Sequence, residues 1–288
     1  MKRPLCLLLL AALAGPAAAQ QVPPAFQSHC KASTTSALRK THCETRDLSL
    51  TAPPAGTPLA VDARLNGSIV VRGWAGKTVR VRALVQAWSG TVEDARALAA
   101  SVRLSSVSNQ LAAARANASL DDWAVSYEVL VPTQISLQLH ATNGSLHLEN
   151  VRGTITFETT NGSVQLLNLA GDVRGKTTNG SLALTLTGPT WDGSGLDVQT
   201  TSGSINCALP ATYAATLTAR TTNGRVKAHL DSAVRKQLLP RSLTATFGKG
   251  GPQMRLATVN GGVLVEQQGA PRSNAKQEPA PAETKGKE

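Results

Sequence analysis

The sequence has few aromatic residues, with four Trp, two Tyr and three Phe among 288 residues. Proteins that bind single-stranded nucleic acids stack the bases on aromatic rings, so this scarcity argues against that class. Beyond the first 20 residues the sequence also lacks any apolar run of about 18 residues, and we expect no internal transmembrane helix. Basic residues outnumber acidic ones, 29 to 18, and the formal charge of +11 indicates only a weak preference for anionic surfaces.

The first 19 residues have the pattern of a secretory signal peptide. Lys2 and Arg3 form a positive start, residues 5–13 form a short apolar run, and the alanines at 17–19 provide a cleavage site. Removal of residues 1–19 takes away two positive charges and lowers the net charge from +11 to +9. The sequence therefore predicts export to the periplasm, the cell envelope or the medium, where disulfides can form.

Cleavage would also remove Cys6 and leave three cysteines. Cys30 and Cys43 lie in a polar N-terminal segment, residues 20–58, and their spacing favours a disulfide that ties this segment down. Each of the two follows a histidine, so a Cys2His2 metal site is the alternative, although the usual C-x2-C spacing is missing.

The end of the chain, residues 269–288, is rich in Pro, Lys and Glu and has no apolar periodicity. Such a segment cannot bury enough apolar surface to order itself, and we expect a disordered, charged tail.

The middle of the sequence repeats a short Asn-Gly motif, TNGS, whose first three glycines are 18 residues apart. Asn and Gly tolerate positive φ, so each motif predicts a sharp reversal, and the alternating apolar residues between motifs predict strands. The later spacings of 23, 21 and 37 residues indicate inserted loops. We expect the asparagines to form a stabilising ladder along one corner. The predicted turn residues, all structural, are Asn143, Gly144, Asn161, Gly162, Asn179, Gly180, Ser202, Gly203, Asn223, Gly224, Asn260 and Gly261.

Aligned by these turns, the strands place apolar residues in shared columns, as with Leu137 and Val173. A shift of one residue would turn every such side chain to solvent. Coils of two strands and two turns, stacked at about 4.8 Å, explain the equal spacing better than a meander of hairpins does. We therefore predict an all-β, single-stranded β-solenoid (β-helix) of about 18 residues per coil over residues 141–268, with a loop at 187–195 and a hairpin at 242–258.

The same alignment puts Cys207 in an inward column, with Leu184 and Ala228 as its neighbours. We expect it to be a buried free thiol that packs as a small apolar side chain, which supports the pairing of the other two cysteines.

Residues 59–140 have a different pattern. Ile69 matches the columns after a turn, whereas Val61 is out of phase with the columns before one, so we expect a starter coil whose first strand pairs differently. A helix is predicted at about 91–101, with Thr91 as its N-cap. Together with flanking strands, it is expected to form a β-rich cap over the open end of the solenoid.

Four segments, in this order, resemble the bacterial DUF4097 family of adhesin-like β-strand-repeat proteins: NGSIVVRGW, SYEVLVP, the repeated TTNGSV, and TATFGKGG followed by LATVNGGV. The resemblance covers residues 59–266. It implies a right-handed β-helix-like fold and an exported or envelope location, and it brings no catalytic residues. The segment 20–58 and the charged tail lie outside it.

The repeat favours a non-enzymatic envelope or surface protein that serves as a scaffold or an adhesin-like binding module, because its sheet faces present regular rows of side chains. The positive charge suggests an anionic glycan or envelope polymer as partner, and other envelope proteins are a further possibility. An ordinary solvated strand face is the alternative interpretation of the densest basic stretch. That stretch, the predicted basic patch, consists of Arg72, Lys77, Arg80 and Arg82.

A polysaccharide-cleaving enzyme on a β-helix is the alternative function. Such chemistry needs converging carboxylates or a metal, and the outward columns spread the acids apart. His140 and His147 flank the first turn, with Glu149 as the nearest third ligand, but surface histidines are the simpler interpretation. We predict no catalytic residue, no cofactor, no metal site and no nucleic-acid partner.

Overall fold

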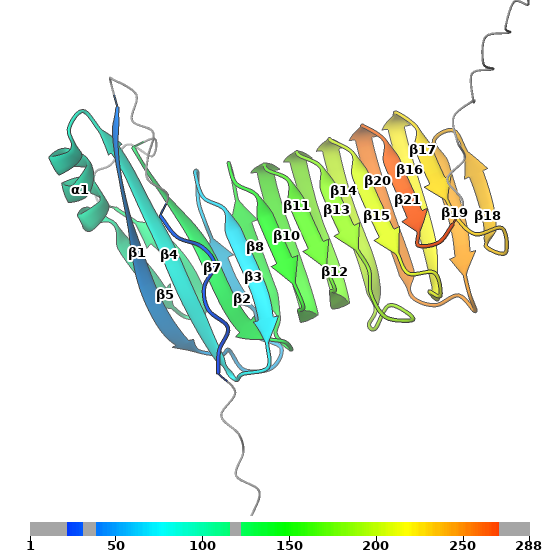
Figure 1. The fold of residues 1–288 in the computed structure, drawn as a ribbon, viewed down its shortest axis with the longest axis horizontal. Helices are drawn as coiled ribbons and strands as arrows, with labels where there is room; N and C mark the ends of the chain where they lie inside the picture. Colours follow the sequence, from blue (N-terminus) through cyan, green and yellow to red (C-terminus); the bar gives the residue numbers. More distant parts are fainter. Residues whose placement is uncertain (1–21, 31–38, 116–121, 271–288) are drawn as a thin grey trace, which may run out of the picture.

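The computed structural model describes residues 22–30, 39–115 and 122–270. In these ranges the protein is all-β with one helix, and two open sheets face each other in an elongated stack (Figure 1). Within the part of the chain described, no helix has the length and apolar character needed to cross a bilayer.

Two predicted segments fall outside these ranges. The signal peptide, 1–19, lies wholly outside the described residues, as does Cys6. Of the predicted tail, 269–288, only the first two residues are described.

The two sheets have ten and eleven strands. The ten-stranded sheet contains, in spatial order, β1 (Lys40–Thr51), β4 (Thr78–Ser89), β7 (Trp123–Pro132), β3 (Ile69–Trp74), β9 (Leu146–Glu149), β11 (Val164–Leu167), β13 (Leu182–Thr185), β15 (Ile205–Leu209), β21 (Val263–Gln267) and β17 (Val226–His229). The eleven-stranded sheet contains β18 (Arg235–Leu239), β19 (Ser242–Phe247), β16 (Ala215–Asn223), β20 (Gln253–Asn260), β14 (Gly195–Ser202), β12 (Ala170–Asn179), β10 (Arg152–Asn161), β8 (Leu137–Ala141), β2 (Leu59–Asp62), β6 (Gln110–Ala114) and β5 (Arg103–Val107).

The central strands stack in parallel with a constant register. Leu137 of β8 lies beside Ile155 of β10, which lies beside Val173 of β12, so the pairing steps by 18 residues. On the ten-stranded sheet β9, β11 and β13 repeat the step, and Leu146 lies beside Val164. The inward columns of this region are therefore those that the sequence predicts.

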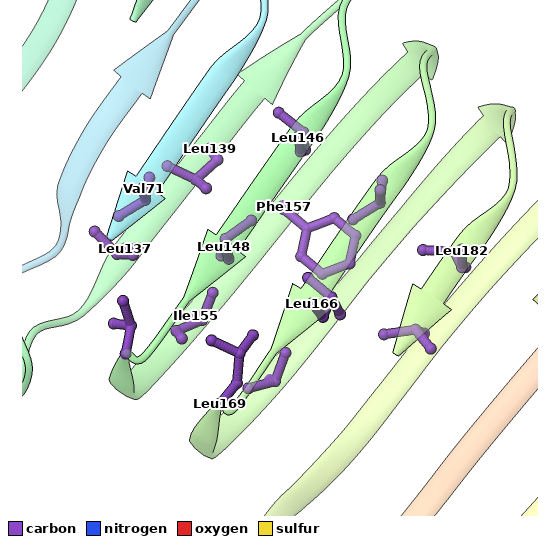
Figure 2. Close-up of a cluster of buried hydrophobic side chains, with 14 of the residues drawn as sticks. Val71, Leu137, Leu139, Leu146, Leu148, Ile155, Phe157, Leu166, Leu169 and Leu182 are labelled. Carbon is purple, nitrogen blue, oxygen red and sulfur yellow. The ribbon is translucent and has the colours of Figure 1, made fainter. Parts of the chain in front are cut away.

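The core is a thin layer of aliphatic side chains between the two sheets. Figure 2 shows Leu139 and Phe157 from one sheet facing Leu148 and Leu166 from the other, and all four are buried. Full burial of one such side chain stabilises the fold by roughly 1.5–3 kcal/mol. Gly175 interrupts the column because the ring of Phe157 occupies the space where its Cβ would lie.

The strand order departs from the sequence order after β14. β20 pairs in parallel with β14 on one side and with β16 on the other, so the last coil of the chain lies between the two coils that precede it in sequence. The 18-residue step also ends there, because Thr177 pairs with Thr200 and Thr200 pairs with Thr258. The prediction of one uniform, sequentially stacked solenoid is thus not confirmed.

The predicted hairpin at 242–258 is wrong. β19 and β20 do not pair with each other, because β16 lies between them. Three glycines with positive φ (Gly248, Gly250 and Gly251) let the connection step across β16. The hairpin is instead formed by β18 and β19, which pair in antiparallel fashion.

The interposed β21 also corrects the surroundings of Cys207. Its neighbours in the sheet are Leu184 and Val265, and Ala228 lies one strand further on, beside Val265. Cys207 is buried as a free thiol, and burial raises its pKa to about 12.

The starter coil pairs as the later coils do, contrary to the prediction. Leu59 and Val61 of β2 align with Leu137 and Leu139 of β8. The one-residue phase difference is taken up by Arg64, which adopts a positive φ of 53° before the chain rejoins the register.

The N-terminal end is closed by antiparallel strands and the helix. β7 runs between β3 and β4 and pairs in parallel with β3 and in antiparallel fashion with β4. The helix, α1 (Val92–Ser101), begins after Thr91, whose side chain accepts a hydrogen bond from the Asp94 amide. At its other end Arg46 of β1 donates to the carbonyl oxygens of Ala99 and Val102. These contacts hold α1 against β1 and β4.

Candidate functional site

The Asn-Gly turns form one corner of the stack, and their polar groups bond to one another. The Asn143 amide donates to Asn66 at 3.0 Å, and the Asn161 amide donates to Asn143 at 2.7 Å. Ser202 stands where the ladder is interrupted. The buried Thr177 hydroxyl donates to the Gly162 carbonyl at 3.0 Å. These contacts favour a structural rather than a ligand-binding role for this corner.

The conformation of these turns differs from the prediction. None of the predicted turn glycines, and none of the asparagines before them, has a positive φ. A Cβ atom on Gly162 would instead overlap the carbonyl oxygen of Gly144 in the coil below, and the same overlap recurs at Gly144, Gly180, Gly203, Gly224 and Gly261. Glycine is required here by close backbone approach, not by the turn type.

The predicted basic patch is occupied by the chain itself. Arg82 forms an ion pair with Asp47 at 2.8 Å, and the guanidinium groups of Arg80 and Arg82 lie over the ring of Phe26. Arg72 forms an ion pair with Glu128. Only Lys77 projects from its turn without a described partner of this kind.

The segment that covers this patch, residues 22–30, is here called the strap. It crosses the outer face of β4 and β7 and buries Glu128, an outward-facing residue. The Glu128 carboxylate accepts hydrogen bonds from the backbone amides of Gln27 (3.0 Å) and Ser28 (2.6 Å). Burial by itself raises the pKa of Glu128, but these hydrogen bonds and the Arg72 charge outweigh it, and the net pKa lies below its ordinary value.

A disulfide between Cys30 and Cys43 joins the end of the strap to β1. Both sulfurs are bonded to each other, so the alternative Cys2His2 metal site is excluded. Sequence reasoning treated the surrounding segment, 20–58, as lying before the domain, yet β1 is a twelve-residue strand of the ten-stranded sheet.

The histidines weighed as metal ligands lie on different sheets. His147 is on β9 with its Nε2 3.5 Å from Glu149, whereas His140 is on β8, beside Glu158 and Asp62 in the sheet register. No cluster of three metal-ligating side chains occurs among the residues that the structure describes.

The strongest candidate site is one that the sequence did not single out. The outward residues of β12, β14, β20 and β16, with the turn before β19, form a surface that we call the basic face. It has five cations and one carboxylate. Its residues are Arg174, Lys176, Thr178, Asp197, Gln199, Thr201, Arg255, Ala257, Val259, Thr218, Arg220, Thr222 and Arg241.

Three shallow hollows follow one another across this face. The first and second share Gln199, Ala257 and Arg220 as lining residues. The second and third share Asp197 and Arg255. The small side chain of Ala257 forms the floor between longer neighbours, because Gln199 and Arg220 flank it in the sheet. A continuous groove results, parallel to the strands.

The two ends of the groove differ in charge. At the third hollow Arg174 pairs with Asp172 at 3.0 Å, and Arg255 lies 3.9 Å from Asp197. At the first hollow Lys176, Arg220 and Arg241 line the surface and no carboxylate does.

The opposite side of the same coils carries little charge. The outward residues of β13, β15, β21 and β17 are mostly small or neutral, with one lysine and one glutamate among them. They are Ala183, Thr185, Asn206, Ala208, Leu264, Glu266, Lys227 and His229. The positive charge in this half of the stack is therefore concentrated on one sheet.

Comparison with known families agrees with this architecture. The model of the Toastrack DUF4097 family matches residues 85–266. The chain belongs to the Toastrack DUF4097 family. The match covers the basic face and begins within β4, later than the start at residue 59 expected from the sequence resemblance, and it leaves the strap and the disulfide outside. No curated protein matches the chain.

Solved structures of low similarity include three that cover 78% of this chain. One is a candidate cell adhesion protein from Clostridium sporogenes, with 9% identity, a TM-score of 0.40 and all of its own chain covered. Another is a candidate adhesin from Bacteroides fragilis, with 14% identity, a TM-score of 0.40 and 97% of its chain covered. The third is a candidate lipid binding protein from Parabacteroides distasonis, with 10% identity, a TM-score of 0.27 and 96% coverage. No ligand of the present chain follows from them.

Proposed function

We propose that this Toastrack protein is a non-enzymatic, exported envelope or surface protein that binds an anionic polymer through its basic face. The observation that carries the proposal is the groove on this face, lined at one end by three cations and no carboxylate. An exposed row of cations attracts a polyanion from a distance and holds it in many registers. The basic patch that the sequence suggests is a weaker candidate, because Asp47, Glu128 and Phe26 already contact its arginines.

The scaffold suits this function. We infer that β8 to β15 form a short right-handed β-solenoid of about 18 residues per coil, flanked by less regular coils. The constant register of Leu137, Ile155 and Val173 supports this description. Continuous hydrogen bonding and a filled aliphatic core make such a stack stiff, so its outward side chains keep fixed spacings of about 4.8 Å across the strands.

Export is part of the proposal. The disulfide between Cys30 and Cys43 supports an oxidising compartment, since such bonds are rare in the cytosol. Fractionation of cells that produce the tagged protein tests this point. We expect the protein in the periplasmic, envelope or culture fraction, and recovery from the cytosol alone would contradict it.

The binding experiment uses the protein beginning at residue 20 and three resins that carry polygalacturonate, a glycerol-phosphate polymer or neutral dextran. We expect retention on at least one anionic resin at about 0.05 M salt and release well before 1 M, where charges are screened beyond about 3 Å. Dextran should retain nothing. Failure of both anionic resins to retain the protein at low salt would contradict the proposed function.

The alternative function, cleavage of a polysaccharide, gains little from the groove. Asp172 and Asp197 line one hollow, but the nearest charged partner of each is a guanidinium group, 3.0 Å and 3.9 Å away. A carboxyl that acts as general acid needs the opposite environment, one that favours its protonated form. Release of reducing ends from a panel of acidic polysaccharides would revive this alternative.

A further inference from the structure

We propose that the first hollow of the groove is a seat for a single negatively charged group of an acidic glycan, held by Arg220 and Arg241 with Lys176 beside them. This inference rests on the proposed function and adds to it where, and by which residues, the charged group is held. The hollow measures about 380 Å³, large enough for one sugar-sized unit, and it opens to solvent along the groove.

The two arginines come from different elements that are fixed to each other. Arg220 lies at the exposed end of β16, beside Ser242 of β19. Arg241 lies in the turn between β18 and β19, and its carbonyl accepts a hydrogen bond from the Thr221 amide at 3.0 Å. The neighbouring Pro240 carbonyl accepts one from the Val226 amide at 2.9 Å. The turn is thus bound to the sheet by its backbone, which leaves the Arg241 side chain for another role.

The charge at this hollow has no counterpart in the protein. Arg220 and Arg241 form no ion pair with any residue in the described ranges. Lys176 shares its charge with Glu158 at 3.1 Å, outside the hollow. Guanidinium groups form paired hydrogen bonds with carboxylate and phosphate oxygens, so two adjacent free arginines favour an oxyanion over other ligands.

The rest of the lining favours a hydroxylated ligand. Three exposed threonines stand in one row, Thr178, Thr201 and Thr222, and the amide of Gln199 lies next to them. Hydroxyl and amide groups both donate and accept hydrogen bonds, as sugar hydroxyls require. Further along, Asp197 and Gln253 offer an acceptor and an amide. The sequence of groups along the groove therefore matches a charged group attached to a sugar chain better than a chain of closely spaced phosphates.

The test compares a double variant of the seat, Arg220→Ala with Arg241→Ala, with a control, Lys77→Ala with Lys227→Ala. Both remove two exposed charges, but the control residues lie away from the basic face. Dissociation constants are measured for soluble polygalacturonate, a glycerol-phosphate polymer and dextran, after unfolding temperatures show that both variants are folded. We expect the seat variant to lose on the order of tenfold or more in affinity for polygalacturonate, and the control less than about twofold.

A third variant, Arg220→Lys with Arg241→Lys, keeps the charge and removes the paired hydrogen bonds, and we expect an intermediate loss. Equal losses in the seat and control variants would overturn the seat and leave a diffuse electrostatic surface, with the proposed function intact. Stronger binding of the glycerol-phosphate polymer than of polygalacturonate would overturn the acidic-glycan assignment. Absence of binding by the unchanged protein to either anionic polymer would overturn both the seat and the proposed function.

Discussion

Gly162 lies directly against Gly144 of the preceding coil, and a Cβ atom on Gly162 would overlap the Gly144 carbonyl oxygen. The obstacle is backbone, which belongs to a strand hydrogen-bonded on both sides, so it cannot move without breaking the stack. The corner is therefore the part of the fold least tolerant of added volume.

Replacement of this glycine should destabilise the protein strongly. Gly162→Ala forces two stacked coils apart, and we expect a loss of at least about 2 kcal/mol in the free energy of unfolding, as for overpacked cores. Denaturant unfolding measures it. Gly90→Ala is the control, since nothing lies within 4 Å of a Cβ there. Similar losses in both variants would show that close approach is not the cause.

The buried threonines of the corner should contribute through their hydroxyl groups. Thr177→Val keeps the shape of the side chain and removes its hydrogen bond to the Gly162 carbonyl, and we expect a loss of about 1 kcal/mol. The adjacent Thr178 is exposed, and Thr178→Val should change stability by less than about 0.5 kcal/mol. Thermal unfolding of the two variants compares them, and a larger effect at Thr178 would contradict the assignment.

The strap should make stability depend on pH through Glu128. Its native pKa lies below the ordinary value, so the unfolded state binds the proton more readily. The stabilising contribution is therefore present above about pH 4.3, the value for an unperturbed glutamate, and is lost as the pH falls through the native pKa. Glu128→Gln should cost roughly 1–3 kcal/mol at neutral pH, as for hydrogen bonds to charged groups, and much less at acid pH.

Urea unfolding of the parent protein and Glu128→Gln from pH 7 to pH 3 measures this difference. The control is Glu158→Gln, which removes an exposed carboxylate paired with Lys176. A difference at Glu128 that stays constant over the whole range would contradict the proposed role of its charge.

The arginines under the strap should matter for the strap and not for polymer binding. Arg80→Ala with Arg82→Ala removes the contacts with Phe26 and the ion pair with Asp47. We expect faster proteolysis within residues 22–30 and unchanged retention on the anionic resins at about 0.15 M salt. Loss of retention with normal protease resistance would return the binding site to this patch.

The central part of the fold was predictable because it depends on local signals. Alternation fixes which residues of each strand face inward, and the equal spacing of Gly144, Gly162 and Gly180 fixes which strands align. The helix was predictable for the same reason, from Thr91 as a cap and an apolar stripe.

The order of the last coils has no local signal. Thr258 and Thr221 precede similar motifs, and either strand fits beside Thr200, so only the length and glycines of the connection at 248–252 decide between them. The location of free charge was equally hidden. Arg80 resembles an unpaired arginine until Phe26, more than fifty residues earlier in the sequence, is placed over it. A signal for this cover existed in β7, where Leu130 faces outward and is apolar.

The position of β20 between β14 and β16 also constrains how the protein is made. A chain that emerges from its N-terminus can add coils in order only as far as β15, because the neighbour of β16 is still unsynthesised. β16 and β17 must wait, unpaired with the stack, until residues 253–267 arrive and complete two coils together. A product that stops short of this segment presents an open parallel edge to proteases and to other chains. The interleaved order thus acts as a completeness check, which only the full-length chain passes.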